Sequence, residues 1–225
     1  LKSIQNDKTI RGITFRGEGG IFCAGGDLKS FKSGLQGDNS NLADVEKMSE
    51  STGEFFELIN TIPVPVIMLA EGAAMAGGLG MLCAADIVVV TKDCKFALTE
   101  TTLGIVPAQI APYIVSRVGL SKARRLMLTA SRFTGKEAFD YGIADFVAEG
   151  SDELMKIESE VKKDILRCAP SANSITKEIV LATRNLDKDS LVKFAAKGFA
   201  KSMMSDEGKE GIKAFVEKRK PSWAE

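Results

Sequence analysis

The chain has 225 residues, with 30 Lys and Arg against 30 Asp and Glu, and it contains no histidine. The absent histidine excludes a Ser-His-Asp triad, a Cys-His pair and any histidine metal ligand. Acid–base chemistry must therefore come from carboxylates, Lys, Tyr, Cys or backbone dipoles. The net charge of zero argues against a general nucleic-acid binder or a membrane-surface binder. The length suits one large domain, or one domain with an appendage.

The ends and the cysteines indicate the compartment. The charged residues near the start do not form a signal peptide, and no apolar run approaches the roughly 18 residues of a membrane span. None of the four cysteines lies in a CxxC pair, and Cys83 stands in an apolar run typical of a core. Scattered thiols favour a reducing compartment. We expect a cytoplasmic protein, with an organellar matrix left open by the start at Leu1.

The first elements in chain order are a strand, several turns and a helix. Apolar alternation predicts a strand over Ile10–Phe15, closed by the turn at Gly17–Gly20. A second turn follows at Gly25-Gly26, and the polar stretch Gly34–Asn41 is predicted to be a mobile loop. Apolar residues at helical spacing then predict a helix over Val45–Ile59.

The following segments continue the alternation of strand and helix. Pro63–Leu69 is predicted to be a buried strand entered through prolines, and Leu79–Ala85 a tightly packed helix. Strands are expected over Ile87–Val90 and Phe96–Leu98. Strands that alternate with helices imply a parallel α/β core.

The second half of the chain is helical in pattern. After a final strand candidate at Asp145–Val147, amphipathic periodicity predicts four helices: Leu154–Leu166, Ala172–Leu186, Ser190–Met203 and Gly208–Lys218. Such helices at the end of a chain pack back on the core or against another subunit. We therefore divide the chain into an α/β core over residues 1–150 and a helical region over residues 151–225.

Two glycine-rich segments present backbone amides after predicted strands. Gly77-Gly78 follow a buried strand and open a helix, whose first amides are free donors at the positive end of its dipole. This arrangement suits an anion, or an oxygen that becomes one. The pattern alone favours the simpler interpretation that the glycines permit close packing of helix and strand. Residues 22–28 present a similar turn but lack the GxGxxG dinucleotide pattern.

Taken together, these segments resemble the enoyl-CoA hydratase/isomerase (crotonase) family over nearly the whole chain. The matching stretches, in order, are IFCAGGDL at 21–28, GAAMAGGLG at 72–80, ADI at 85–87, FALTE at 96–100, LGIVP at 103–107, ASRFTGKEA at 130–138 and EGIKAFVEKRKP at 210–221. The resemblance implies a spiral of ββα units with a C-terminal helical trimerisation region. It also implies a homotrimer or hexamer that acts on acyl-CoA thioesters, with no metal or redox cofactor, since CoA arrives as part of the substrate.

The resemblance places an oxyanion hole on the backbone N–H groups of Gly26 and Gly77. It aligns Glu100 with one of the two glutamates of family hydratases, where a carboxylate can orient water and return a proton to C2. The other interpretation of Glu100 is a surface or helix-capping residue. The position of the first of these two glutamates is held by Gly80, and Glu100 aligns with the second. We expect hydration of a 2-enoyl-CoA; the alternatives are a Δ3,Δ2-enoyl-CoA isomerase using Glu100 alone, and an acyl-CoA-binding protein without catalysis.

Further residues gain expected roles from the same resemblance. The stretch LGIVPAQIAP at 103–112 resembles the methylglutaconyl- and isohexenylglutaconyl-CoA hydratase branch, which implies a place in fatty-acid, branched-chain or isoprenoid acid degradation. Gln109 then bonds a substrate group or water, or is simply a polar helix-start residue. Ala24 and Leu28 match backbone contacts to the adenine end of CoA. Phe215 and Lys218 match CoA contacts, which can come from a neighbouring subunit.

The remaining acids and the chain start carry simpler expectations. Asp27 and Glu71 are expected in turns, and Asp86 at a strand start is expected to be structural. Family members normally begin with two strands, a loop and a long helix before the strand expected here at Ile10–Phe15. The sequence therefore resembles a member that lacks its N-terminal segment.

Overall fold

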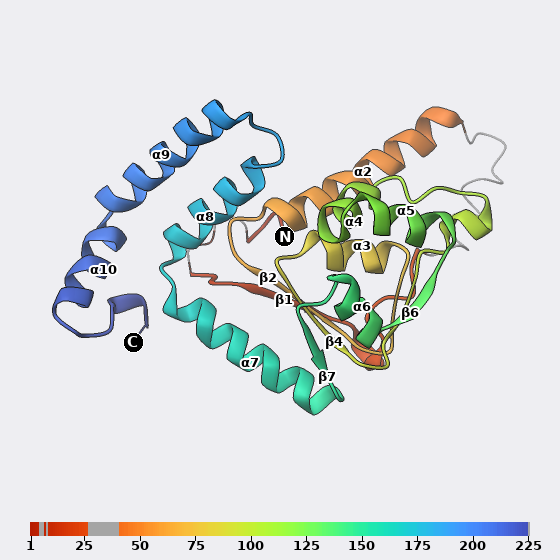
Figure 1. The fold of residues 1–225 in the computed structure, drawn as a ribbon, viewed down its shortest axis with the longest axis horizontal. Coiled ribbons are helices and arrows are strands. Elements are labelled where there is room, and N and C mark those ends of the chain that lie inside the picture. Colours follow the sequence, from red (N-terminus) through yellow and green to blue (C-terminus); the bar gives the residue numbers. More distant parts are fainter. Residues whose placement is uncertain (5–6, 8, 27–40, 225) are drawn as a thin grey trace. The chain divides into compact units, whose positions relative to one another are not determined.

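The computed structural model describes residues 1–4, 7, 9–26 and 41–224 (Figure 1). The chain divides into two compact units. The core unit comprises Thr14–Asn60 and Val66–Glu158, and the terminal unit comprises Leu1–Ile13, Thr61–Pro65 and Ser159–Glu225. The predicted loop at residues 34–41 lies outside the described residues, apart from its last one.

The first sheet has the strand order β1-β2-β4-β7. Strand β2 (Val66–Ala70) is parallel to β4 (Ile87–Thr91), and β4 is parallel to β7 (Phe146–Ala148), while β1 (Ile13–Arg16) forms one edge. Every residue of β2 and all but the first of β4 are buried. Continuous apolar strands of this kind are typical of parallel sheets covered on both faces, which confirms the predicted α/β core.

A second, smaller sheet positions the candidate site. Its strands are β3 (Ala73–Met75), β5 (Lys95–Ala97) and β6 (Arg132–Thr134). Strand β3 is parallel to β5, and β6 is antiparallel to β5. Cys23 forms a parallel bridge with Ala74 on the free side of β3. Neither β3 nor β6 was predicted, whereas the equally short β5 and β7 were expected at Phe96–Leu98 and Asp145–Val147.

Helices of the core unit surround these sheets (Figure 1). They are α2 (Leu42–Thr61), α3 (Gly77–Ala84), α4 (Ala111–Val118), α5 (Leu120–Leu128) and α6 (Gly135–Tyr141). The predictions of α2 and α3 are confirmed, whereas α4, α5 and α6 were missed. Helix α3 packs beside α4. A capping box made by Thr134 and Glu137 fixes the start of α6.

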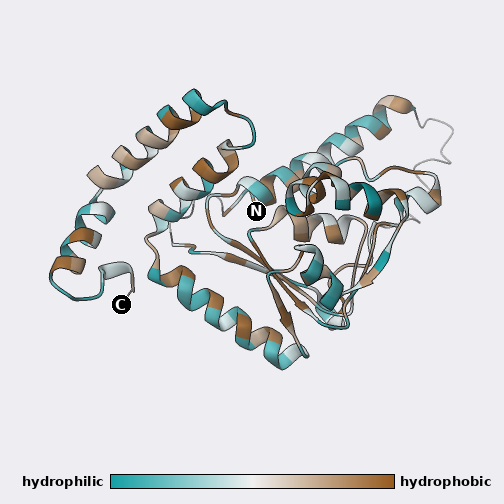
Figure 2. Ribbon diagram, viewed as in Figure 1, coloured by the Kyte–Doolittle hydropathy of each residue, from teal (hydrophilic) through white to brown (hydrophobic). Residues whose placement is uncertain are grey.

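The C-terminal part of the chain consists of helices, as predicted. They are α7 (Ser151–Arg167), α8 (Pro170–Ala182), α9 (Lys188–Met204) and α10 (Asp206–Val216). Asp187 caps α9 by accepting a hydrogen bond from the Ser190 amide at 3.0 Å. Figure 2 shows hydrophobic bands along α9 and α10. In the part of the chain that the structure describes, no helix is long and apolar enough to cross a membrane.

Candidate active site

Three neighbouring backbone segments end at the same edge of the second sheet. The Cys23 amide donates to the Ala73 carbonyl, and the Met75 amide donates to the Cys23 carbonyl, each at 2.9 Å. On the other side of β3, Met75 lies opposite Ala97 of β5. Since the three segments are parallel, their carboxyl ends lie together, and such an edge is the usual ligand position in α/β sheets. Gly26, Gly77 and Glu100 follow these three ends.

The two glycines at the start of α3 have different structural requirements. A Cβ at Gly78 would lie 2.7 Å from the Cys23 Cβ, so close packing demands glycine there. A Cβ at Gly77 would meet no atom nearer than Phe56 Cζ at 3.9 Å. The packing interpretation therefore holds for Gly78 and leaves Gly77 unexplained by packing.

The backbone before Gly77 is held in an unusual conformation. Ala76 has φ 49° and ψ −117°, and its side chain gives α3 no cap. The Ala76 amide is used, since it donates to the Ala97 carbonyl at 2.9 Å. The first amides of α3 have no acceptor within the helix and lie at the positive end of its dipole. Strain of this kind is frequent where a backbone group is aimed at a ligand.

The turn at Gly25-Gly26 lies beside this helix start. Gly25 has φ 101°, a conformation that favours glycine, and a Cβ there would lie 3.6 Å from the Ala76 Cβ. Ala24 and Gly26 are exposed, so their backbone groups are accessible. Asp27 and the predicted CoA contact Leu28 lie outside the described residues.

Glu100 is a buried carboxylate with an unused oxygen. The residue is 9% exposed, and its Oε2 atom has no hydrogen-bond partner. Burial raises the pKa of this carboxyl above its ordinary value. Its backbone carbonyl accepts from the Ile105 amide at 3.1 Å, which fixes the 3₁₀ turn Glu100–Leu103 after β5. A buried, unpaired carboxylate with a raised pKa at a ligand edge is a candidate acid–base group.

Gln109 has a partner within the protein. Its Nε2 atom donates to the Ser49 Oγ at 3.0 Å, and its Oε1 atom would lie 2.5 Å from a Cβ at Gly53. Gln109 therefore packs across α2, and its contact with substrate stays a prediction. Two apolar residues that the sequence analysis did not single out, Phe56 and Ile110, pack on α3 nearby. Phe56 lies three residues before Ile59, the other buried residue of α2, but nothing in the sequence shows that this core adjoins the site.

The other predicted residues lie apart or have structural partners. Phe215 is 85% exposed near the end of α10, Lys218 follows with φ 54°, and both belong to the terminal unit. Their contact with CoA stays a prediction. Asp86 accepts a hydrogen bond from the Val66 amide at 2.8 Å, which confirms its structural role. Glu71 forms an ion pair with Arg16.

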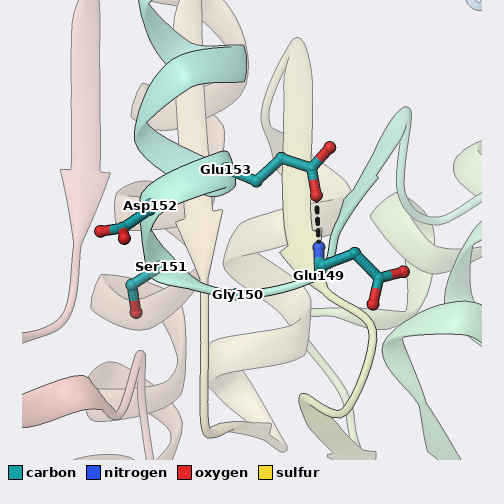
Figure 3. A pocket seen from close by; sticks show the side chains of 5 residues that line it. All are labelled: Glu149, Gly150, Ser151, Asp152 and Glu153. Carbon is teal, nitrogen blue, oxygen red and sulfur yellow. Dashed lines mark hydrogen bonds between the residues drawn. The ribbon is translucent and has the colours of Figure 1, made fainter.

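A separate hollow lies at the start of α7 (Figure 3). Its lining residues are Glu149, Gly150, Ser151, Asp152 and Glu153. The Glu153 carboxylate accepts from the Glu149 amide at 2.8 Å, and Glu149 also pairs with Lys92. The acids lie at the start of the helix, and their charge is unsuited to the phosphates of CoA. The hollow contains none of the candidate site residues.

Comparisons with known proteins agree with this architecture. The family model described as enoyl-CoA hydratase/isomerase matches residues 1–225. A probable enoyl-CoA hydratase of Bacillus subtilis (strain 168) is 32% identical over 224 residues, which are 99% of this chain and 85% of the relative. The mitochondrial methylglutaconyl-CoA hydratase of Homo sapiens is 30% identical over 236 residues, covering 99% of this chain and 66% of that protein.

Solved structures give the same result. Pseudomonas aeruginosa AtuE superposes with a TM-score of 0.96 and 39% identity, covering 100% of this chain and 86% of the other. The fold expected from the sequence is thereby confirmed as the crotonase fold. The ordered motifs, the matching family model and the superposition agree over the length of the chain, which belongs to the enoyl-CoA hydratase/isomerase family.

Proposed function

We propose that the protein is an enoyl-CoA hydratase, which adds water across the C2=C3 bond of a 2-enoyl-CoA thioester. One observation carries the proposal: Glu100 is buried, leaves Oε2 unpaired, and follows β5 at the sheet edge that also carries Gly26 and Gly77. The family and the relatives named as hydratases support the same reaction class.

In the proposed reaction, the water oxygen bonds to C3 while the Glu100 carboxylate accepts a proton from that water. The electron pair of the double bond moves toward the thioester, whose oxygen becomes an enolate oxygen. The N–H groups of Gly26 and Gly77 donate hydrogen bonds to this oxygen, and losing one such donor costs about 2.7–4 kcal/mol of transition-state stabilisation. The protonated Glu100 then gives its proton to C2. Its raised pKa favours the first of these two transfers, because a carboxylate with a higher pKa is a stronger base toward water.

The acyl group remains to be identified by experiment. A relative named methylglutaconyl-CoA hydratase directs attention to branched and carboxylated substrates in branched-chain or isoprenoid acid degradation, beside the straight chains of fatty-acid degradation. A screen of straight, branched and carboxylated 2-enoyl-CoAs, ranked by kcat/KM, identifies the preferred class.

A second candidate function is a Δ3,Δ2-enoyl-CoA isomerase. The observation that favours it is Gly80, which supplies no carboxylate to assist Glu100. In this reaction Glu100 removes a proton from C2 of a 3-enoyl-CoA and returns it to C4, while the double bond moves to C2=C3. The same two amides stabilise the intermediate oxygen.

Two absorbance assays and one binding assay separate these candidates. The protein is mixed with a 2-enoyl-CoA, and loss of the conjugated thioester absorbance reports hydration. A 3-enoyl-CoA is tested in parallel, and gain of that absorbance reports isomerisation. If absorbance rises with the 3-enoyl-CoA but does not fall with the 2-enoyl-CoA, the isomerase replaces the hydratase as the proposed function. Binding of CoA thioesters with neither signal would indicate a binding protein without catalysis.

We also propose a homotrimer or hexamer assembled through the C-terminal helices. Large apolar side chains are exposed on α8, α9 and α10: Val180, Val192, Phe199, Met204, Phe215 and Val216. Exposed apolar surface of this extent supports an interface. Light scattering on the purified protein gives the mass that tests this proposal.

A further inference from the structure

The α3 face that begins at Gly77 is covered by two buried apolar side chains. Gly80 lies three residues after Gly77, so both share one helix face. A Cβ at Gly80 would lie 2.2 Å from Ile110 Cγ2 and 3.2 Å from Phe56 Cε1. Ile110 is 4% exposed and Phe56 is 3% exposed. We call Phe56 and Ile110 the apolar wall. It leaves no room for any side chain at position 80.

Hydrogen bonds made by the sequence neighbours of Ile110 and Phe56 hold the apolar wall in place. Next to Ile110, the Gln109 side chain donates to Ser49 of α2 at 3.0 Å. Next to Phe56, Glu57 accepts a hydrogen bond from the Tyr113 hydroxyl at 2.8 Å. The rings of Phe56 and Tyr113 also lie 6.0 Å apart. Helix α2 and residues 109–113 are therefore joined on both sides of the wall, and movement of Ile110 away from Gly80 would strain these contacts.

We propose that Ile110, together with Phe56, fills the volume beside Gly80 and so leaves Glu100 as the one carboxylate at this sheet edge among the residues that the structure describes. The inference rests on the proposed function and adds to it. Because no acid can be placed at position 80, Glu100 makes both proton transfers.

A double-variant cycle on thermal stability tests the packing. Gly80→Ala is expected to lower Tm by roughly 2–8 °C in the wild-type background, because the added Cβ overpacks Ile110. In an Ile110→Gly background, the same change should cost less, since both Cγ2 and the Cβ that would lie 2.7 Å away are absent. Gly77→Ala is the control for adding a methyl to this face without a clash, and it should leave Tm nearly unchanged. Equal losses in both backgrounds would overturn the role of Ile110.

Activity then tests the consequence for catalysis. Gly80→Glu combined with Ile110→Gly should hydrate a 2-enoyl-CoA at least about tenfold faster than the matched Gly80→Gln, Ile110→Gly protein, because a second acid–base group has been added. Equal rates would overturn the claim that Ile110 excludes a useful carboxylate. The two proposals fail on different results. If the Tm loss caused by Gly80→Ala depends on residue 110 but no protein, wild type included, turns over substrate, the hydratase proposal is overturned and the packing proposal stands.

Discussion

Two glutamates of the core unit are buried to a similar degree but differ in the hydrogen bonds that their carboxylates accept. Glu71 is 6% exposed and follows β2, and Glu100 is 9% exposed and follows β5. One Glu71 oxygen accepts from Arg16 Nε at 2.8 Å, and the other accepts from the Ser151 hydroxyl. The Oε2 atom of Glu100 has no partner.

The surroundings shift the two pKa values in opposite directions. The Ser151 hydroxyl and the Arg16 guanidinium lower the pKa of Glu71 against the effect of burial. Burial raises the pKa of Glu100, and a hydrogen bond from its own backbone amide offsets only part of that rise. A carboxylate bonded on both oxygens stabilises the fold, whereas one kept unpaired can exchange a proton with a ligand. Burial alone therefore does not identify a catalytic acid; the bonding of its oxygens does.

The largest expected effect is a difference in catalytic activity between variants of Glu100 and of Glu71. Glu100→Gln should reduce kcat about 10²–10⁴-fold, because general acid–base catalysis is lost while the shape is kept. The matched Glu71→Gln protein should keep kcat within about tenfold of wild type. Steady-state kinetics on the best substrate of the screen measures both. Similar losses in the two variants would contradict the contrast.

The second effect is a loss of unfolding free energy when the partners of Glu71 lose its carboxylate. Glu71→Ala leaves the Arg16 guanidinium and the Ser151 hydroxyl without their partner, and should cost about 1–3 kcal/mol of unfolding free energy. We expect a loss of unfolding free energy near the lower end of this range, because the Arg16 side chain is 39% exposed and its charge is screened by water. Chemical denaturation gives the free energy. A Glu71→Gln control keeps an acceptor and should lose less; equal losses would show that hydrogen bonding is not the cause.

The third effect is a difference in pH dependence. The lowered pKa of Glu71 contributes stability that is present above the ordinary value of 4.5 and is lost as the pH falls. The raised pKa of Glu100 makes the folded protein lose stability as the pH rises above 4.5. Relative to wild type, Tm of Glu100→Gln should therefore increase as the pH rises above 4.5, and Tm of Glu71→Gln should decrease as the pH rises toward 4.5 from below. If the Tm differences of the two variants change with pH in the same direction, the pKa values of Glu71 and Glu100 are not shifted in opposite directions.

The same contrast shows what the sequence could predict. Periodicity predicts the long helices, and α2, α7 and α9 lie close to their expected ranges, whereas the shorter α4, α5 and α6 were missed. The catalytic candidates came from ordered motifs. The short strands β3 and β6 were missed, yet β3 is the element that brings Gly26, Gly77 and Glu100 to one edge. A three-residue strand obtains its conformation from its neighbours, which a local pattern does not contain.

The partners of the glutamates could not be predicted either. Sequence separations of 55 residues for Arg16 and 80 residues for Ser151 hide the ion pair and hydrogen bond of Glu71. The same holds for Ile110, which packs on Gly80 from 30 residues away. The sequence shows that a carboxylate is missing at Gly80, but only the fold shows that an apolar side chain occupies the space.

The smallest expected effect concerns how Arg16 holds Glu71. Arg16 directs Nε at 2.8 Å and Nη2 at 2.6 Å toward the same Oε1 atom. Lysine would replace this two-donor contact with a single point charge, so Arg16→Lys should cost only about 0.5–1 kcal/mol. Arg16→Met removes the charge while keeping much of the length, and should cost more. If the lysine variant matches the methionine variant in denaturation, the geometry of the guanidinium stabilises Glu71; if lysine matches wild type, charge alone is sufficient. Because neither variant alters the surroundings of Glu100, kcat should stay near the wild-type value in both, and a large loss would show that the two carboxylates are coupled.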